Sequence, residues 1–178
     1  MMGINKVIRN RGMNDMPKNL TVEQKNILSS MKVGAAFAAD VAHACITMYV
    51  WDDNPKFLYI YHQELPRTQF LGELPDKTGR ELRGNEEPLV QRALQRGVPL
   101  SGKRELSLGL FVDLRVYPIQ DSKGKCFAVV AFDTNEPEEL FIITAVEFLK
   151  NTGRQILSSN YYGRLLPGDG LMIVDKDK

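Results

Sequence analysis

The sequence has little cysteine and little histidine. Its 178 residues include two cysteines, Cys45 and Cys126, and two histidines, His43 and His62. No spacing among these four residues matches a known metal cage, so we expect no metal site. Two isolated thiols in a chain with enough apolar residues for a core are typical of buried, reduced cysteines, which predicts a cytoplasmic protein.

The motifs of common enzyme classes are also missing from the sequence. It has no Gly-x-Ser-x-Gly nucleophile turn and no glycine-rich phosphate loop, and neither cysteine has a local histidine on the same face. A phosphoacceptor helix and the nucleotide-binding motifs of a histidine kinase are not found either. We therefore expect this chain to be no enzyme by itself and to need no cofactor.

Long hydrophobic runs and an excess of charge of one sign are lacking as well. The longest fully apolar stretches are 35–39 and 126–132, which are too short to cross a bilayer. The formal net charge is +1, from 23 basic and 22 acidic residues. This balance gives no field that attracts nucleic acid, so we expect neither membrane insertion nor nucleic-acid binding.

Helical periodicity is present at both ends of the folded part. Thr21 followed by Gln24 is a capping-box pattern, and the apolar residues after it repeat every three or four positions as far as Cys45. A second helix is predicted from residue 136 onward. Its apolar positions resemble a short heptad seam: Ile142, Val146, Leu149, Gly153 and Ile156. A patch of small residues at 34–38 in the first helix would let a partner helix come close.

Between these helices the periodicity changes to that of strands. Two hairpins are predicted, one with strands at 46–51 and 57–63 and one with strands at 111–119 and 126–133. The residues between the hairpins are expected to form a long loop at 64–84, a short helix capped by Asn85 and stopped by Gly97, and an edge strand at 98–106. The fold class is therefore α+β, an antiparallel sheet with long terminal helices packed on one face.

One face of the predicted hairpins carries the candidate ligand-binding residues. We expect Arg115 to bind an anionic group of a small ligand beneath the 64–84 loop, between aromatic and polar walls. The alternative is a half-solvated face on which Arg115 and Asp113 pair across or along the strands. The candidate residues are Tyr59, Tyr61, Phe111, Asp113, Arg115 and Tyr117.

The order of elements and three short motifs resemble the GAF domain. The motifs are 79–82 (Gly-Arg-Glu-Leu), 87–90 (Glu-Pro-Leu-Val) and 93–97, which holds Ala93, Leu94 and Gly97. They are similar to the GAF-like sensory region at the N-terminus of certain bacterial sensor histidine kinases, over roughly residues 25–160. The resemblance implies a non-catalytic signal-input domain whose parent protein is a histidine kinase of a two-component system.

The last residues resemble the start of a PAS domain. Residues 166–177 hold an Asp-Gly pair, four apolar residues and an acidic turn. We therefore expect a flexible arm at 1–19, a sensory domain at 20–162, and a linker with the first PAS strand at 163–178. The alternative for the last segment is a strand added to the main sheet.

Three functions are compatible with these patterns. The first is a sensor that binds a small molecule or relays a conformational signal through its terminal helices. The second is a structural dimerisation module, and the third is the effector-binding domain of a transcription regulator. In each case we expect a homodimer through the terminal helices.

Overall fold

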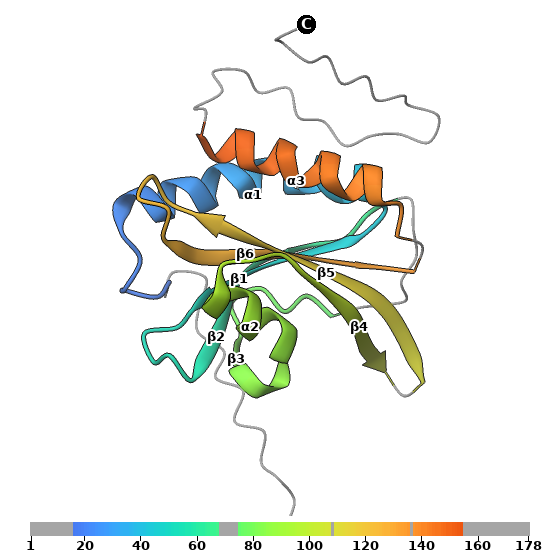
Figure 1. Ribbon diagram of the computed structural model, residues 1–178, viewed down its shortest axis with the longest axis horizontal. Helices are drawn as coiled ribbons and strands as arrows, with labels where there is room; N and C mark the ends of the chain where they lie inside the picture. Colours follow the sequence, from blue (N-terminus) through green and yellow to red (C-terminus); the bar gives the residue numbers. More distant parts are fainter. Residues whose placement is uncertain (1–15, 68–74, 108, 136, 155–178) are drawn as a thin grey trace, which may run out of the picture.

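The computed structural model describes residues 16–67, 75–107, 109–135 and 137–154. Within them, one antiparallel sheet is flanked by α-helices on both faces (Figure 1). The elements in chain order are α1 (Val22–Ala42), β1 (Cys45–Trp51), β2 (Phe57–Glu64), β3 (Glu81–Arg83), the 3-10 helix η1 (Gly84–Glu86), α2 (Pro88–Arg96), β4 (Leu100–Ser107), β5 (Leu110–Gln120), β6 (Cys126–Thr134) and α3 (Glu139–Arg154). The predicted fold class is confirmed.

The sheet has six strands in the order β3-β2-β1-β6-β5-β4. The first and last strands of the described residues, β1 and β6, therefore lie side by side at its centre, with Cys45 opposite Asp133. Both predicted hairpins are present, and β4 is the edge strand that the basic pair Lys103 and Arg104 indicated.

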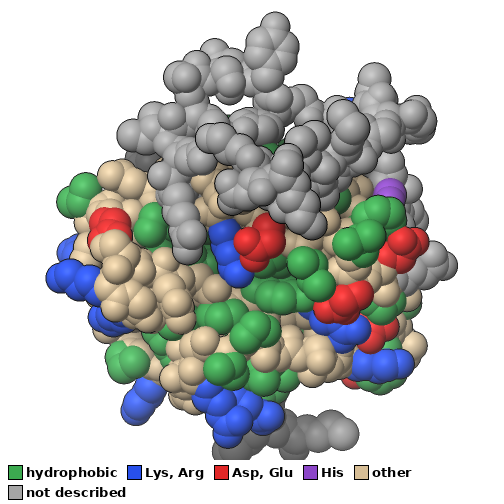
Figure 2. Space-filling model, turned by 45° about the horizontal axis from the view of Figure 1, so that its top comes forward, with side chains coloured by type: hydrophobic (Ala, Val, Ile, Leu, Met, Phe, Trp, Pro, Cys, Tyr) green, Lys and Arg blue, Asp and Glu red, His purple; other side chains and the backbone are tan. Residues whose placement is uncertain are grey.

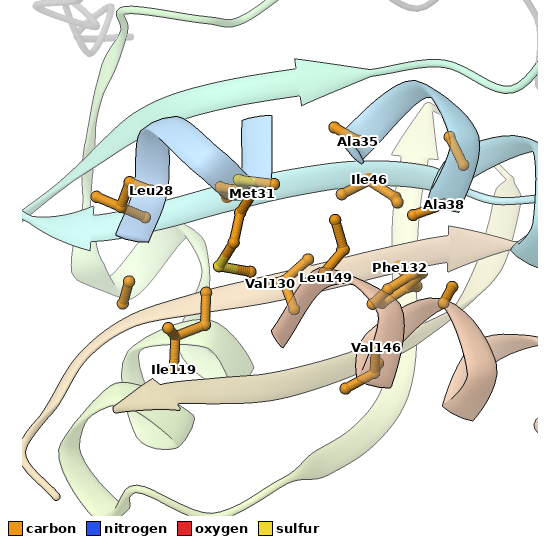
Figure 3. Close-up of a cluster of buried hydrophobic side chains, with 14 of the residues drawn as sticks. Leu28, Met31, Ala35, Ala38, Ile46, Ile119, Val130, Phe132, Val146 and Leu149 are labelled. Atoms are coloured by element: carbon orange, nitrogen blue, oxygen red, sulfur yellow. The ribbon is translucent and has the colours of Figure 1, made fainter. Parts of the chain in front are cut away.

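Both terminal helices cover the same face of the sheet. Figure 3 shows Leu28 and Met31 of α1 and Leu149 of α3 gathered over the central strands, and all three are fully buried. The helices pack closely because Gly34 lacks a side chain: a Cβ there would lie 2.8 Å from the Phe148 ring. α2 packs on the opposite face, against a second apolar cluster that includes Leu114 and Val129.

The ends of α1 and α2 differ from the prediction. α1 ends at Ala42, because His43 adopts a left-handed conformation (φ 47°), so Cys45 opens strand β1 instead of closing the helix. α2 begins at Pro88 with Glu87 as its N-cap, so the expected cap at Asn85 is wrong. Pro88 suits a first helical position because its missing N–H would be unpaired there, and Asn85 is used by the preceding 3-10 turn.

The other turn signals have the expected roles. Thr21 and Gln24 form the reciprocal capping box, and Gly97 ends α2 in a left-handed conformation. The predicted loop at 64–84 ends in the short strand β3 and in η1, because Leu82 and its neighbours pair with the outer edge of β2. No helix of the described segments is long and apolar enough to span a bilayer.

Residues 166–177, interpreted above as the start of a PAS domain, lie outside the described residues. So do residues 1–15, most of the predicted arm, and Ile156 of the predicted seam.

Candidate functional site

The tyrosines predicted to bind a ligand lie under the terminal helices. Tyr59 is 2% exposed and belongs to the core between the sheet and these helices. Tyr61 packs against the same core, and its hydroxyl lies 3.3 Å from Ser29 Oγ on α1. Helices α1 and α3, instead of the 64–84 loop, therefore cover this face.

The predicted residues on β5 lie apart from these tyrosines. Arg115 forms an ion pair with Glu139 of α3, with 3.6 Å between Nε and Oε2, and Tyr117 stacks edge-on against Phe132. Phe111 is 57% exposed, near the tip of the β4–β5 hairpin. Asp113 is half-buried, opposite Lys103 on β4 and Thr134 on β6.

Tyr117 packs against the same core cluster as Tyr59 and Tyr61, but Phe111, Asp113 and Arg115 are not part of that cluster. Strands β2 and β5 are separated by β1 and β6, a spacing of about 14 Å at the usual distance between strands. Arg115 pairs with Glu139 of α3, whereas the alternative stated above expected pairing across or along the strands. A ligand role for these six side chains stays a prediction.

A buried ionic network occupies the opposite face, beside the start of α2. Arg104 of β4 donates from Nη1 to Asp133 Oδ2 at 2.6 Å and from Nη2 to Glu87 Oε2 at 2.7 Å. Nη2 also donates to the Tyr49 hydroxyl at 3.2 Å. One guanidinium therefore joins an edge strand, the N-cap of α2 and both central strands.

Burial and charge set the ionisation of this network. Burial raises the pKa of Asp133 to about 6, although the attraction of Arg104 opposes the shift. Burial alone would lower the pKa of Arg104, but the surrounding Tyr49, Asp133 and Glu87 raise it, so the guanidinium stays charged. Burial, with a smaller contribution from Asp133, raises the pKa of the Cys45 thiol to about 11, so it is neutral at pH 7.

Two polar atoms of the network have no hydrogen-bond partner. They are Asp133 Oδ1 and Arg104 Nε, both buried in the described part of the protein. A buried polar atom left unpaired costs about 1–3 kcal/mol, so such atoms are uncommon and call for an explanation. Asp133 is only 2% exposed, so bulk water does not satisfy it.

A cavity lies where β2 ends, and none of the residues of the network lines it. Its volume is about 360 Å³, and it is lined by Gln63, Glu64, Leu65, Pro66, Arg67 and Asp76. The Gln63 amide donates to Cys45 Sγ at 3.5 Å, and Cys45 is the residue opposite Asp133 in the sheet. Arg67 is held to α1, because its backbone N–H donates to the buried carboxylate of Asp40 at 2.8 Å.

The sequence analysis missed this site. Arg104 was interpreted only as a charge that protects an edge strand, and Asp133 only as the end of an apolar strand. A usable signal was present, because period two places Arg104 on the face opposite its exposed neighbours Lys103 and Glu105. Its partners could not be predicted, since Glu87 and Asp133 lie 17 and 29 positions away.

The comparisons with known proteins agree with the fold. A family model described as "Histidine kinase PdtaS, GAF domain" matches residues 16–140. No curated protein sequence matches the chain. A solved structure described as "Sensor region of a sensor histidine kinase" aligns with a TM-score of 0.55 at 17% identity, covering 80% of this chain and 51% of that chain.

Two further solved structures align less closely. Residues 122 to 287 of a methyl-accepting chemotaxis protein align with a TM-score of 0.49 at 13% identity, covering 74% of this chain and 91% of that chain. An IcIR transcriptional regulator from Alicyclobacillus acidocaldarius aligns with a TM-score of 0.48 at 10% identity, covering 76% and 66%. At 17% identity the alignment with the kinase sensor region shows a shared fold alone, and the chain spans about half the length of that region.

We predict that Arg104→Gln destabilises the protein by about 3–5 kcal/mol, because it leaves the buried carboxylate of Asp133 and the partly buried one of Glu87 without their cation. Chemical denaturation followed by circular dichroism measures the change. Lys103→Gln is the matched control: it removes the neighbouring exposed charge and should cost less than about 0.5 kcal/mol. Equal stability of the two variants would show that the network does not stabilise the fold.

Proposed function

The chain belongs to the family of the histidine kinase PdtaS GAF domain, and from this we propose that it is the non-catalytic signal-input domain of a cytoplasmic two-component histidine kinase. The phosphotransfer activity then belongs to other parts of the parent protein. Binding of a small molecule on the α2 face would alter how β6 holds the two terminal helices. The supporting observation is a junction at the end of β6.

Two consecutive residues make this junction. Asp133 points to the α2 face, where it binds Arg104. Thr134 points to the helix face, because side chains alternate along a strand, and its hydroxyl donates to the His43 carbonyl at 3.2 Å. His43 is the C-cap of α1, and its ring meets Phe141 of α3 edge-on with centroids 6.1 Å apart.

These contacts form a continuous path from the α2 face to both terminal helices. A displacement of Asp133 would move Thr134 with it, since the two share a peptide bond. The hydrogen bond to His43 would carry that displacement to the end of α1, and the ring contact would carry it to α3. A ligand that favours one position of Asp133 would therefore favour one arrangement of the helix pair.

The reading frame downstream of Lys178 tests the assignment to a kinase. We expect it to encode a phosphoacceptor histidine helix and a nucleotide-binding domain. A helix-turn-helix in their place would support the effector domain of a transcription regulator and contradict this proposal.

Thr134→Val in the full-length parent protein tests the junction. The substitution keeps the shape of the side chain and removes the hydrogen bond to His43, so we expect the autophosphorylation rate to change by about threefold or more for a stability cost of about 1 kcal/mol. Thr152→Val is the control, because its hydroxyl bonds only to Leu149 of the same helix. If both variants leave autophosphorylation at the wild-type rate, the junction relays nothing.

We also propose that the domain is a homodimer through its terminal helices. The residues first assigned to the seam, such as Ile142 and Leu149, are buried in the chain's own core. The outer face of the helix pair still exposes Val33 (69%), Leu140 (73%) and Ile143 (46%). Figure 2 shows this side of the molecule, with hydrophobic side chains next to charged ones.

Charge on this outer face fits a second copy of the chain. Lys32 lies beside Val33 on α1, and Glu139 and Glu147 lie beside the exposed apolar residues of α3. Packing α1 of one copy against α3 of its partner would bring Lys32 to a surface where Glu139 is paired with Arg115 and Glu147 with Lys150 of the same chain.

Ile143→Glu should dissociate this dimer, because it places a charge in the apolar centre of the interface. Sedimentation velocity measures the oligomeric state. Val98→Glu, which alters a residue 44% exposed outside the helix pair, should leave the dimer intact. A wild-type chain that sediments as a monomer, or a dimer unaffected by Ile143→Glu, would contradict this interface.

A further inference from the structure

A second cavity lies on the helix face of the sheet, where both terminal helices meet β5. Its volume is about 280 Å³. Ile27 and Met31 of α1, Lys150 of α3 and residues 117–120 of β5 line it. None of the residues of the ionic network lines this cavity, so it is separate from the α2 face. Its volume is at the lower end for small-molecule sites, so its occupant would be small.

The walls of this cavity are mainly apolar. Met31 and Ile119 are 0% and 4% exposed, and both belong to the buried cluster drawn in Figure 3. Ile27 is partly buried and packs against the same cluster. Pro99 and Pro118 complete the apolar part of the lining. An apolar part of a ligand would therefore leave water for contact with core side chains, which favours binding.

The charge of the lining is positive. Among the described residues that line the cavity, Lys150 is the one that is charged at pH 7. Gln120 adds amide N–H donors and Tyr117 adds a hydroxyl. Burial raises the pKa of Tyr117, so its hydroxyl is neutral at pH 7 and adds no negative charge. A carboxylate accepts hydrogen bonds from all three kinds of donor, whereas an ammonium group would meet a like charge.

The carboxylates nearest to these residues in the sequence already have partners. Asp121, in the turn after β5, accepts from Gln24 Nε2 at 2.9 Å and from the backbone N–H of Lys123 at 3.0 Å. Glu147 pairs with Lys150 at 3.0 Å, but Glu147 is 59% exposed. Surface ion pairs of this kind contribute little to stability, so Lys150 can exchange Glu147 for a ligand carboxylate at small cost.

We propose that this cavity binds a small organic carboxylate with an apolar tail, whose carboxylate pairs with Lys150 and whose tail packs against Met31 and Ile119. The inference goes beyond the function proposed above, because it concerns a second site, on the helix face. Since α1 and α3 both line the cavity, the bound molecule would contact both terminal helices at once and restrain their separation.

Calorimetric titration of the 178-residue chain with sodium octanoate tests this site. We expect saturable binding of octanoate. Butyrate should bind about tenfold or more weakly, because its shorter tail removes fewer CH₂ groups from water. Octylammonium, which has the same tail length and the opposite charge, should show no saturable binding.

Two substitutions separate the effect of the ammonium group from that of its ion pair. Lys150→Gln removes the ammonium group and should weaken octanoate binding by about fivefold or more. Glu147→Gln is the matched control, because it breaks the same ion pair but keeps the ammonium group. It should leave octanoate binding unchanged or tighter. Neither residue is buried, so both variants should fold.

Any of four results would overturn the proposal: no saturable binding of octanoate, equal binding of butyrate or of octylammonium, wild-type affinity in Lys150→Gln, or an equal loss of affinity in both variants. These measurements use the isolated chain and do not depend on the parent protein. The kinase assignment is tested separately by the downstream reading frame, so the two can fail independently.

Discussion

The arrangement of this domain depends on one guanidinium. Arg104 binds Glu87 and Asp133 at 2.7 and 2.6 Å, and through them it connects the edge strand β4 with α2 and with the central strand β6. Around this network, α2 packs on the sheet through an apolar cluster that includes Val90 and Leu94 of the helix. Apolar packing tolerates sliding, whereas charge-assisted hydrogen bonds fix direction and distance, so the network sets where α2 sits on the sheet.

The same network also contains buried hydrogen-bonding groups that have no partner. One carboxylate oxygen and one guanidinium nitrogen are buried without partners, and the carboxylate stands at the end of the strand that leads into α3. Proteins keep such groups mainly where function requires them. The network and the proposed relay meet at consecutive residues: Asp133 faces α2, and Thr134 faces the terminal helices.

Much of the fold could be predicted from the sequence, because local signals determine it. The capping box at Thr21, the stop at Gly97 and the two hairpins follow from residue type and period. Which helices cover each face of the sheet could not be predicted from periodicity. Period two indicates which side chains of a strand share a face, as it did for Tyr59 and Arg115, but it does not indicate what covers that face. The ionic network was missed for a similar reason: its members lie far apart in sequence, and period two gives only the direction of Arg104.

The central position of β1 and β6 has a mechanical consequence. The helices flanking these strands run antiparallel, with Gly34 of α1 beside Phe148 and Thr152 of α3, so the start of α1 and the end of α3 lie toward the same end of the molecule. A pull applied between these two ends would peel the helices apart from that end before it strained any strand of the sheet. The sheet can therefore stay intact while the start of α1 and the end of α3 separate.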